Sequence, residues 1–200
     1  TLDTTAPTIS SIAVTGVTSG QFGNSGSYTV VVTASEALAA APTLTLATGS
    51  VGSGAGSVSD TVWTYTLTST AGASVAHTIK VAAGGASDVA GTVTTGDSAT
   101  FSWTQDTVLA TPTVVAMSTS DSTPSITGTF DDGDYTAFTV VVNSVTYTAG
   151  ADAELVVSDD GSDAWTLTTP ALSDNSYQVV ATVTDRAGNS EVDGSSGELE

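Results

Sequence analysis

Carboxylates are the residues of this chain with the most evident chemistry. Of its 200 residues, 21 are aspartate or glutamate, against one lysine and one arginine, which gives a formal net charge of -19 at pH 7. Carboxylate and carbonyl oxygens are the preferred ligands of hard divalent cations, and Ca²⁺ takes roughly six to eight of them. The chain therefore has the groups for calcium binding, and the positions of these groups decide whether they act together.

Other kinds of chemistry lack their usual residues. The chain has no cysteine and a single histidine, His77, which excludes thiol catalysis, disulfide frameworks and Cys/His zinc sites. A serine hydrolase needs a base beside its nucleophile, and only His77 is available, at what we interpret as a packing or capping position at a strand end. The carboxylates also lack the apolar strand context that suits a glycosidase acid. We therefore expect no enzyme.

Charge and hydropathy exclude two classes of partner. With one lysine and one arginine the chain cannot form a basic patch, which excludes binding to nucleic acid or anionic lipid by that route. No apolar run approaches the roughly 18 residues that a membrane span needs. The high net charge favours a monomer.

The elements that position the carboxylates are predicted to be short strands. Tyr28, Val30, Val32 and Ala34 alternate with Thr29, Val31 and Thr33, the period of a half-buried strand. The same alternation returns along the chain at Trp63–Leu67, Ile79–Val81, Ile126–Phe130, Phe138–Val142, Trp165–Leu167 and Tyr177–Val183. Gly-, Ser-, Asn- and Asp-rich segments between these runs predict turns, so the chain is expected to be all-β.

The sequence repeats itself with a period of about 100 residues. Residues 3–8 resemble 106–113, each starting with Asp-Thr and ending with Pro-Thr, and Trp63 corresponds to Trp165. Asp-Val-Ala-Gly-Thr at 88–92 corresponds in the same way to Asp-Arg-Ala-Gly-Asn at 185–189. We therefore predict two tandem domains, 1–105 and 106–200, joined by a short linker at about 104–111.

Each predicted domain has the strand content of an immunoglobulin-like β-sandwich. About seven short strands in some 100 residues, with an inward tryptophan, are typical of this fold. In the second domain, residues 172–177 precede a long strand and resemble the tyrosine corner of such sandwiches, with Tyr177 as the tyrosine. The sequence does not distinguish an immunoglobulin-like sandwich from a fibronectin-type or cadherin-type sandwich.

This fold would gather the acidic residues at one end of each domain. In an immunoglobulin-like topology the chain start, the B–C loop and the F–G loop meet at the same end of the sandwich. All three places are acidic in both domains: they hold Asp3, Glu36 and Asp88 in the first, and Asp106, Asp131, Asp132, Asp134 and Asp185 with Asn189 in the second. We predict a Ca²⁺ site in each set; magnesium fits less well because it demands stricter geometry.

Two alternative interpretations stay open at this point. Acidic loops also occur as solvated surface that keeps a β protein soluble, without any ion. Trp63, Trp103 and Trp165 could line a sugar-binding face, although their strand positions favour the core for at least Trp63 and Trp165. A further acidic loop with Asp159, Asp160 and Asp163 cannot be assigned to either end of its domain.

Several segments together resemble a known family. They are the two Asp-Thr starts, Ser35-Glu36, Ser-Thr-Pro-Ser-Ile-Thr-Gly at 122–128, Trp-Thr-Leu at 165–167, and the stretch 177–189. The chain resembles the tandem bacterial immunoglobulin-like repeats of very large secreted adhesins of the RTX type, including ice-binding and biofilm adhesins. The resemblance covers essentially the whole chain and is stronger in the second domain, since Thr92 stands where Asn189 does. The nonapeptide RTX calcium repeat itself is absent.

The resemblance implies a structural function at the bacterial cell surface. Domains of this family are calcium-stiffened extenders that hold a distal ligand-binding region away from the cell, so the partners expected here are neighbouring immunoglobulin-like domains of the same chain. Without calcium, residues 104–111 would form a flexible hinge. The alternative is a module that binds glycan or peptide through loops or a sheet face. We expect an internal fragment or a mature piece of a larger secreted protein, and the sequence leaves open whether Leu199-Glu200 is native or a cloning remnant.

Overall fold

The chain is all-β. A computed structural model describes residues 3–58, 60–131, 133–158 and 162–200, and these residues form strands and loops without a helix. No helix capable of crossing a membrane is therefore present in the described ranges. The chain divides into two compact units, Thr1–Thr107 and Val108–Glu200.

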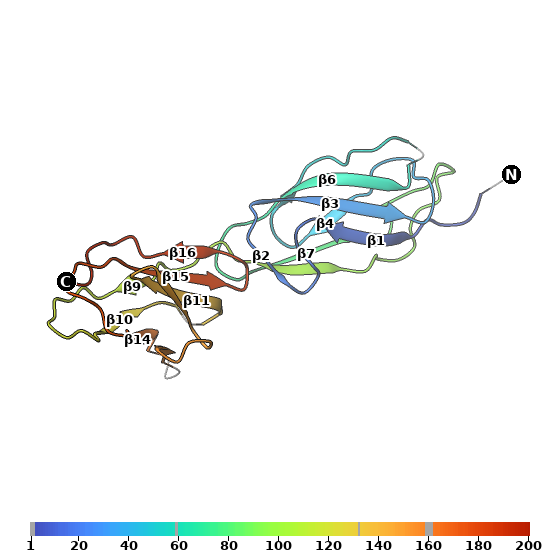
Figure 1. Cartoon of the computed structure of the whole chain (residues 1–200). Coiled ribbons are helices and arrows are strands. Elements are labelled where there is room, and N and C mark those ends of the chain that lie inside the picture. Colours follow the sequence, from blue (N-terminus) through green and yellow to red (C-terminus); the bar gives the residue numbers. More distant parts are fainter. Residues whose placement is uncertain (1–2, 59, 132, 159–161) are drawn as a thin grey trace. The chain divides into compact units, whose positions relative to one another are not determined.

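The first unit is a sandwich of two four-stranded sheets (Figure 1). One sheet has the order β1-β3-β6-β5 and consists of β1 (Ile9–Val14), β3 (Ser27–Ala34), β6 (Val62–Thr68) and β5 (Ser50–Val51). The other has the order β2-β8-β7-β4 and consists of β2 (Phe22–Gly23), β8 (Phe101–Gln105), β7 (Val75–Val81) and β4 (Leu44–Leu46). The short β2 pairs with β8 in parallel, whereas β7 is antiparallel to both of its neighbours.

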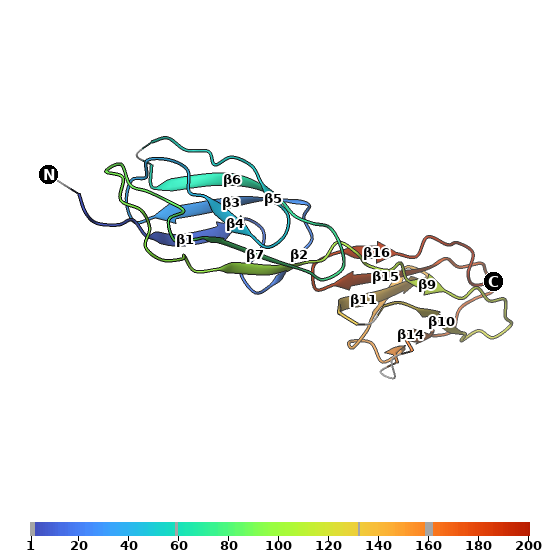
Figure 2. The ribbon, with the colours of Figure 1, turned by 180° about the vertical axis from the view of Figure 1, so that it is seen from behind.

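The second unit repeats this architecture. One sheet has the order β13-β14-β10-β9 and consists of β13 (Leu155–Val157), β14 (Ala164–Thr168), β10 (Ser125–Thr129) and β9 (Thr113–Val114). The other has the order β12-β11-β15-β16 and consists of β12 (Val145–Thr148), β11 (Tyr135–Val142), β15 (Val179–Asp185) and β16 (Ser190–Val192). The reverse view shows β11, β15 and β16 side by side (Figure 2).

Alternation of side chains fixes which face of each strand is buried. In β3, Val30 and Val32 point into the core, and the register places them opposite Tyr65 and Trp63 of β6. A slip by one residue would turn these side chains to solvent, so the apolar pattern specifies the pairing. The same inward alternation runs along β15, where Val179, Ala181 and Val183 are buried. The predicted tandem immunoglobulin-like β-sandwiches are thus confirmed.

The tryptophans belong to the two cores and not to a sugar-binding face. Trp63 and Trp103 are buried in the first core and Trp165 in the second, as the strand pattern predicts for Trp63 and Trp165. His77 packs face to face on Trp103, with 4.7 Å between the ring centroids. It does so from the third position of β7 and not from the strand end that the sequence indicates.

The predicted tyrosine corner is present in the second unit. The hydroxyl of Tyr177 donates a hydrogen bond to the backbone oxygen of Ser173 at 2.9 Å. This bond closes the loop that leads into β15, as such corners do in immunoglobulin-like sandwiches.

Leu199 and Glu200, to which the sequence gives no role, belong to the folded second unit. Leu199 is buried in the second core and bridges Met117 in parallel and Tyr177 in antiparallel fashion. The backbone N–H of Glu200 donates to the oxygen of Met117 at 3.1 Å. The last residues are therefore anchored to the second unit by isolated bridges and hydrogen bonds.

Candidate metal sites

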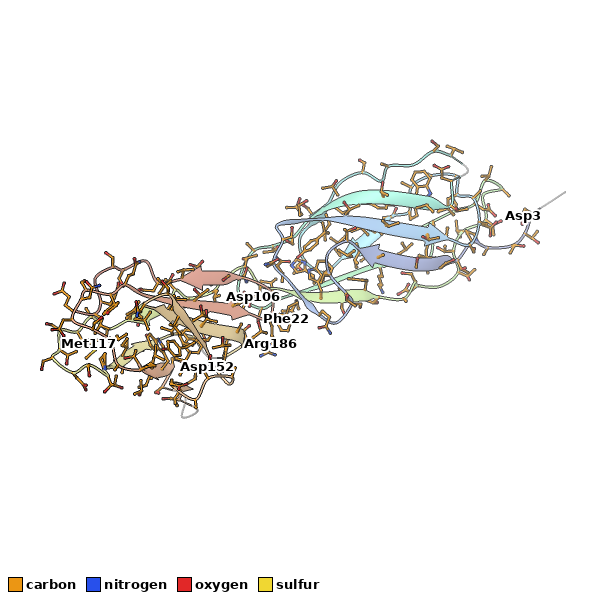
Figure 3. All side chains as sticks on the ribbon, viewed as in Figure 1. Asp3, Phe22, Asp106, Met117, Asp152 and Arg186 are labelled. Atoms are coloured by element: carbon orange, nitrogen blue, oxygen red, sulfur yellow. The ribbon has the colours of Figure 1, made fainter. Side chains whose placement is uncertain are left out.

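Three segments of the first unit bring Asp3, Glu36 and Asp88 together. Carboxylate oxygens of the three residues all lie within 4.8 Å of one another. Asp3 stands at the end of the unit toward which β3 runs (Figure 3). This is the grouping that the sequence predicts from the chain start, the loop after β3 and the loop after β7.

Backbone hydrogen bonds hold these segments in place. Thr8 and Ser35 exchange two bonds of 2.9 Å, one from the N–H of Ser35 to the oxygen of Thr8 and one from the N–H of Thr8 to Oγ of Ser35. An isolated bridge joins Leu38 to Asp88. The chain start is thereby tied to the loop after β3, and that loop to the loop after β7.

The Asp88 carboxylate is buried and only half satisfied. The residue is 2% exposed, and its Oδ1 accepts a hydrogen bond of 2.7 Å from the N–H of Thr92. Oδ2 has no hydrogen-bond partner in the described part of the chain. A buried carboxylate oxygen left unpaired carries a large desolvation cost, so this atom is suited to a ligand that supplies positive charge.

A glycine makes the Asp88 loop possible. Gly91 has a φ of 91°, a conformation in which other residues are strained, and its N–H donates to the oxygen of Asp88 at 3.2 Å. Neither Gly91 nor Leu38 has a role predicted from the sequence. A glycine at the same place in both repeats was the available signal for Gly91; nothing in the sequence pointed to Leu38.

The cluster is electrostatically unfavourable without a cation. The pKa of the Glu36 carboxyl is raised, first by partial burial and then by the negative charges of Asp3 and Asp88. The single lysine, Lys80, forms its ion pair with Asp97 instead.

The geometry fits a calcium ion. Two oxygens bound to the same Ca²⁺ can lie up to about 5 Å apart, because each Ca–O distance is about 2.3–2.6 Å. The three carboxylates meet this limit and supply only oxygen ligands. Asp3, Glu36 and Asp88 could thus hold one Ca²⁺, with backbone oxygens or water completing its shell.

The second unit has a related pair of carboxylates. Oxygens of Asp134 and Asp185 also lie within 4.8 Å of each other. The loop before β11 is tied to the end of β15, because Arg186 donates its backbone N–H to the oxygen of Asp134 at 3.1 Å and its guanidinium to the oxygen of Gly133 at 3.4 Å.

Asp185 differs from Asp88 in one partner. Asn189 donates its backbone N–H to Oδ1 of Asp185 at 2.8 Å and its side-chain amide to Oδ2 at 2.7 Å. Thr92, in the equivalent position of the first unit, contacts only Oδ1 of Asp88. The predicted ligand Asn189 thus lies against the carboxylate and completes its hydrogen bonding.

The other predicted residues have different surroundings. Asp131 is exposed, and its Oδ1 accepts a hydrogen bond from the N–H of Gly133 within its own loop. Asp106 is buried near the end of the first unit and donates its N–H to the oxygen of Gly23 at 2.9 Å; its predicted place beside Asp134 and Asp185 stays a prediction. Asp132 lies outside the described residues.

Asp163, from the further acidic loop, can be placed at one end of its unit. The backbone oxygen of Asp163 accepts a hydrogen bond of 2.8 Å from the N–H of Phe130, so Asp163 lies beside the loop that carries Asp131 and Asp134. Asp159 and Asp160 fall outside the described residues.

Comparison with known proteins supports bacterial immunoglobulin-like repeats. Residues 115–196, most of the second unit, match the family model of the bacterial Ig-like domain. No curated protein matches the chain. This result agrees with the bacterial immunoglobulin-like part of the resemblance noted in the sequence.

Similar solved structures include tandem immunoglobulin domains. An I-band fragment of titin, I67–I69, is 14% identical with a TM-score of 0.49, covering 98% of this chain and 66% of the fragment. The N-terminal part of the bacterial S-layer protein SbsC is 17% identical with a TM-score of 0.34, covering 98% of this chain and 44% of the other. The tandem Ig repeats of Dlar are 9% identical with a TM-score of 0.30, covering 98% of each chain. At these identities the likeness concerns the fold alone.

Proposed function

We propose that this chain is a pair of extender modules of a secreted bacterial surface adhesin of the RTX type, acting in cell adhesion or biofilm formation, and that bound Ca²⁺ stiffens it. One observation carries the calcium part: the buried, unpartnered Oδ2 of Asp88 within a cluster of three carboxylates. The match of the second unit to bacterial Ig-like domains supports the structural part. Immunoglobulin-like sandwiches serve widely as domains of cell-surface proteins.

Calcium would change both charge and stability at the Asp3–Glu36–Asp88 cluster. It would give Oδ2 of Asp88 its missing partner and neutralise carboxylates that otherwise repel one another. Extracellular calcium modules bind with dissociation constants of about 10⁻⁴ to 10⁻³ M. At a calcium concentration ten times above its dissociation constant, each site adds about 1.4 kcal/mol to the free energy of unfolding.

An ion at this cluster would stiffen the segment that enters the first unit. Asp3 belongs to the segment that enters the first unit, while Glu36 and Asp88 belong to loops of its body. An ion shared among them would fasten the entering segment to the unit. The repeat puts Asp106 in the same position relative to Asp134 and Asp185, so the same event at residues 104–111 would restrict the hinge between neighbouring domains.

The calcium site is tested by titration of the metal-free chain with Asp88→Asn as the variant. We expect the wild type to bind Ca²⁺ in calorimetry and to melt about 5–10 °C higher in saturating calcium, with little effect of magnesium. Asp88→Asn should lose one binding site and the calcium-dependent part of the shift in the first unit. Because this change removes a buried unpaired charge, we expect the variant to fold without calcium at least as stably as the wild type.

Asp97→Asn is the matched control, since it removes the same charge from an exposed aspartate of the same unit that pairs with Lys80. It should bind calcium as the wild type does. Unchanged calcium binding by Asp88→Asn, or an equal loss in both variants, would contradict the site.

A further inference from the structure

The second unit has an open cavity at the end where its chain leaves the sheet. The cavity has a volume of about 410 Å³. Its walls are the loop before β10, the loop before β15, and the last two residues, Leu199 and Glu200. The lining is mixed, with Tyr177 and Leu199 beside Asp121 and Asp174.

The first unit has the same three parts in the same arrangement. Val75 pairs with Gln105 there as Tyr177 pairs with Leu199 in the second unit. On the other side of the same strand, Gly23 pairs in parallel with Gln105, as Met117 does with Leu199. Both relations make Leu199 the counterpart of Gln105, and therefore Glu200 the counterpart of Asp106.

Hydrogen bonds confirm this equivalence. The N–H of Asp106 donates to the oxygen of Gly23 at 2.9 Å, and the N–H of Glu200 donates to the oxygen of Met117 at 3.1 Å. The two units thus end their last strand in the same register.

In the first unit the next residue is held by the loop before β7. Thr107 donates its N–H to the oxygen of Gly72 at 3.1 Å, and its Oγ1 accepts the N–H of Gly72 at 3.0 Å. Gly72 lies three residues before Val75, and the residue three before Tyr177 is Asp174, which lines the cavity. A residue after Glu200 would correspond to Thr107. The cavity lies where such a residue would contact Asp174.

We propose that this cavity is the seat of the first residues of a further immunoglobulin-like repeat joined through Glu200. Both repeats of this chain begin with Asp-Thr, at Asp3-Thr4 and Asp106-Thr107. A threonine after Glu200 would bind the backbone of Asp174 as Thr107 binds that of Gly72. This inference rests on the proposed function in so far as it assumes an array of repeats, and it makes the cavity a joint rather than a ligand pocket.

The test extends the chain with a third repeat. One protein carries a copy of residues 107–200 directly after Glu200, and a second carries a flexible six-residue Gly-Ser spacer between Glu200 and that copy. Hydrogen–deuterium exchange of residues 119–124 and 172–177 is compared with that of the original chain, in calcium and in chelator. We expect about tenfold slower exchange at residues 172–177 for the direct fusion alone, because the N–H of Asp174 would gain the partner that the N–H of Gly72 has in Thr107.

Changing the threonine that opens the appended copy to glycine should abolish part of the protection, since it removes the side-chain acceptor. Equal exchange in the original chain and both fusions would overturn the proposal. So would a glycan or peptide whose binding slows exchange in these loops equally in all three proteins.

Measuring exchange both in calcium and in chelator distinguishes failure of this proposal from failure of the proposed function. The seat is built from hydrogen bonds of the backbone and one hydroxyl, so its protection should persist in chelator. Failure of the calcium site would instead show as an absence of calcium binding at Asp88 while the loops of the direct fusion remain protected.

Discussion

Asp88 and Asp185 begin the same five-residue loop, yet their carboxylates have different neighbours. Both loops close with a bond from the aspartate N–H to the oxygen of the fifth residue, at 2.9 Å for Asp88 and 3.1 Å for Asp185. Only the second loop ends in asparagine, and the side-chain amide of Asn189 donates to Oδ2 of Asp185. The first unit thus has the greater need for a cation.

This difference predicts a stabilising substitution. Thr92→Asn should place an amide against Oδ2 of Asp88 as Asn189 does against Asp185, because the backbone of the two loops is hydrogen-bonded alike. In chelator we expect the first unit to gain about 1 kcal/mol, or roughly 4–8 °C in melting temperature. Asn189→Thr should destabilise the second unit by a similar amount. Differential scanning calorimetry checks both variants. A Thr92→Asn variant that melts like the wild type in chelator would contradict the claim that the unpaired Oδ2 of Asp88 destabilises the first unit.

Among the elements, the loop after β7 depends on a backbone conformation that favours glycine. Gly91 has a φ of 91°, and a Cβ added there would meet no atom within 4 Å, so alanine would be penalised by the backbone alone. We expect Gly91→Ala to lower the free energy of unfolding by about 1 kcal/mol and to weaken calcium binding, since it disturbs the Asp88–Thr92 closure.

Gly96→Ala is the matched control, because Gly96 also has open space around it and lies outside the positive-φ region. Urea unfolding and calorimetry of the two variants give the comparison. Equal effects would show that the conformation of the loop does not matter.

A buried hydrogen bond joins β6 to the loop before β4 in the first unit. The phenol of Tyr65, on β6, donates to the backbone oxygen of Pro42 at 2.5 Å, and burial raises the pKa of Tyr65 to about 12. Its proton is thus retained in the folded chain between pH 10 and about 12 but lost from the unfolded chain. The stabilisation should be complete below pH 10 and should disappear as the pH rises toward 12.

Urea unfolding of the first unit, followed by tryptophan fluorescence at pH 8 and pH 11.5, measures this effect. The loss of stability between the two values should be larger for the wild type than for Tyr65→Phe, which lacks only the phenol hydroxyl. An equal loss in both proteins would show that the loss of stability at high pH does not come from Tyr65.

The sequence predicts the elements better than it predicts their contacts. Alternation in β3, β6 and β15 is strong because one face must be buried, so strands and tryptophan positions follow directly. Two-residue strands such as β2 and β5 carry no periodicity and could not be found. The sequence gives no role to the end of the chain because Leu199 and Glu200 show no pattern of their own; their place depends on pairing with Met117 and Tyr177.

The candidate site was predictable only in outline. Topology alone predicts Asp3, Glu36 and Asp88 at one end, and in the structure their carboxylate oxygens lie within 4.8 Å of one another. Sequence could not show that Asp131 bonds within its own loop, or that Thr92 leaves an oxygen of Asp88 without a partner. Both depend on burial and on side-chain direction.

Calcium binding at the second set of carboxylates would restrict residues 104–111, which join the two units. The chain has no cysteine, so two introduced cysteines can carry spin labels without interference. Thr45 on β4 and Thr146 on β12 are exposed and belong to different units. The distance distribution between labels at Thr45→Cys and Thr146→Cys reports directly on the linker.

Pulsed electron resonance in chelator, calcium and magnesium gives this distance distribution and shows whether calcium restricts the linker. We predict a broad distribution in chelator and in magnesium that calcium narrows, and no narrowing when Asp134→Asn is added to the labelled chain. A distribution of the same width in calcium and chelator would contradict calcium stiffening and leave the carboxylates as solvated surface.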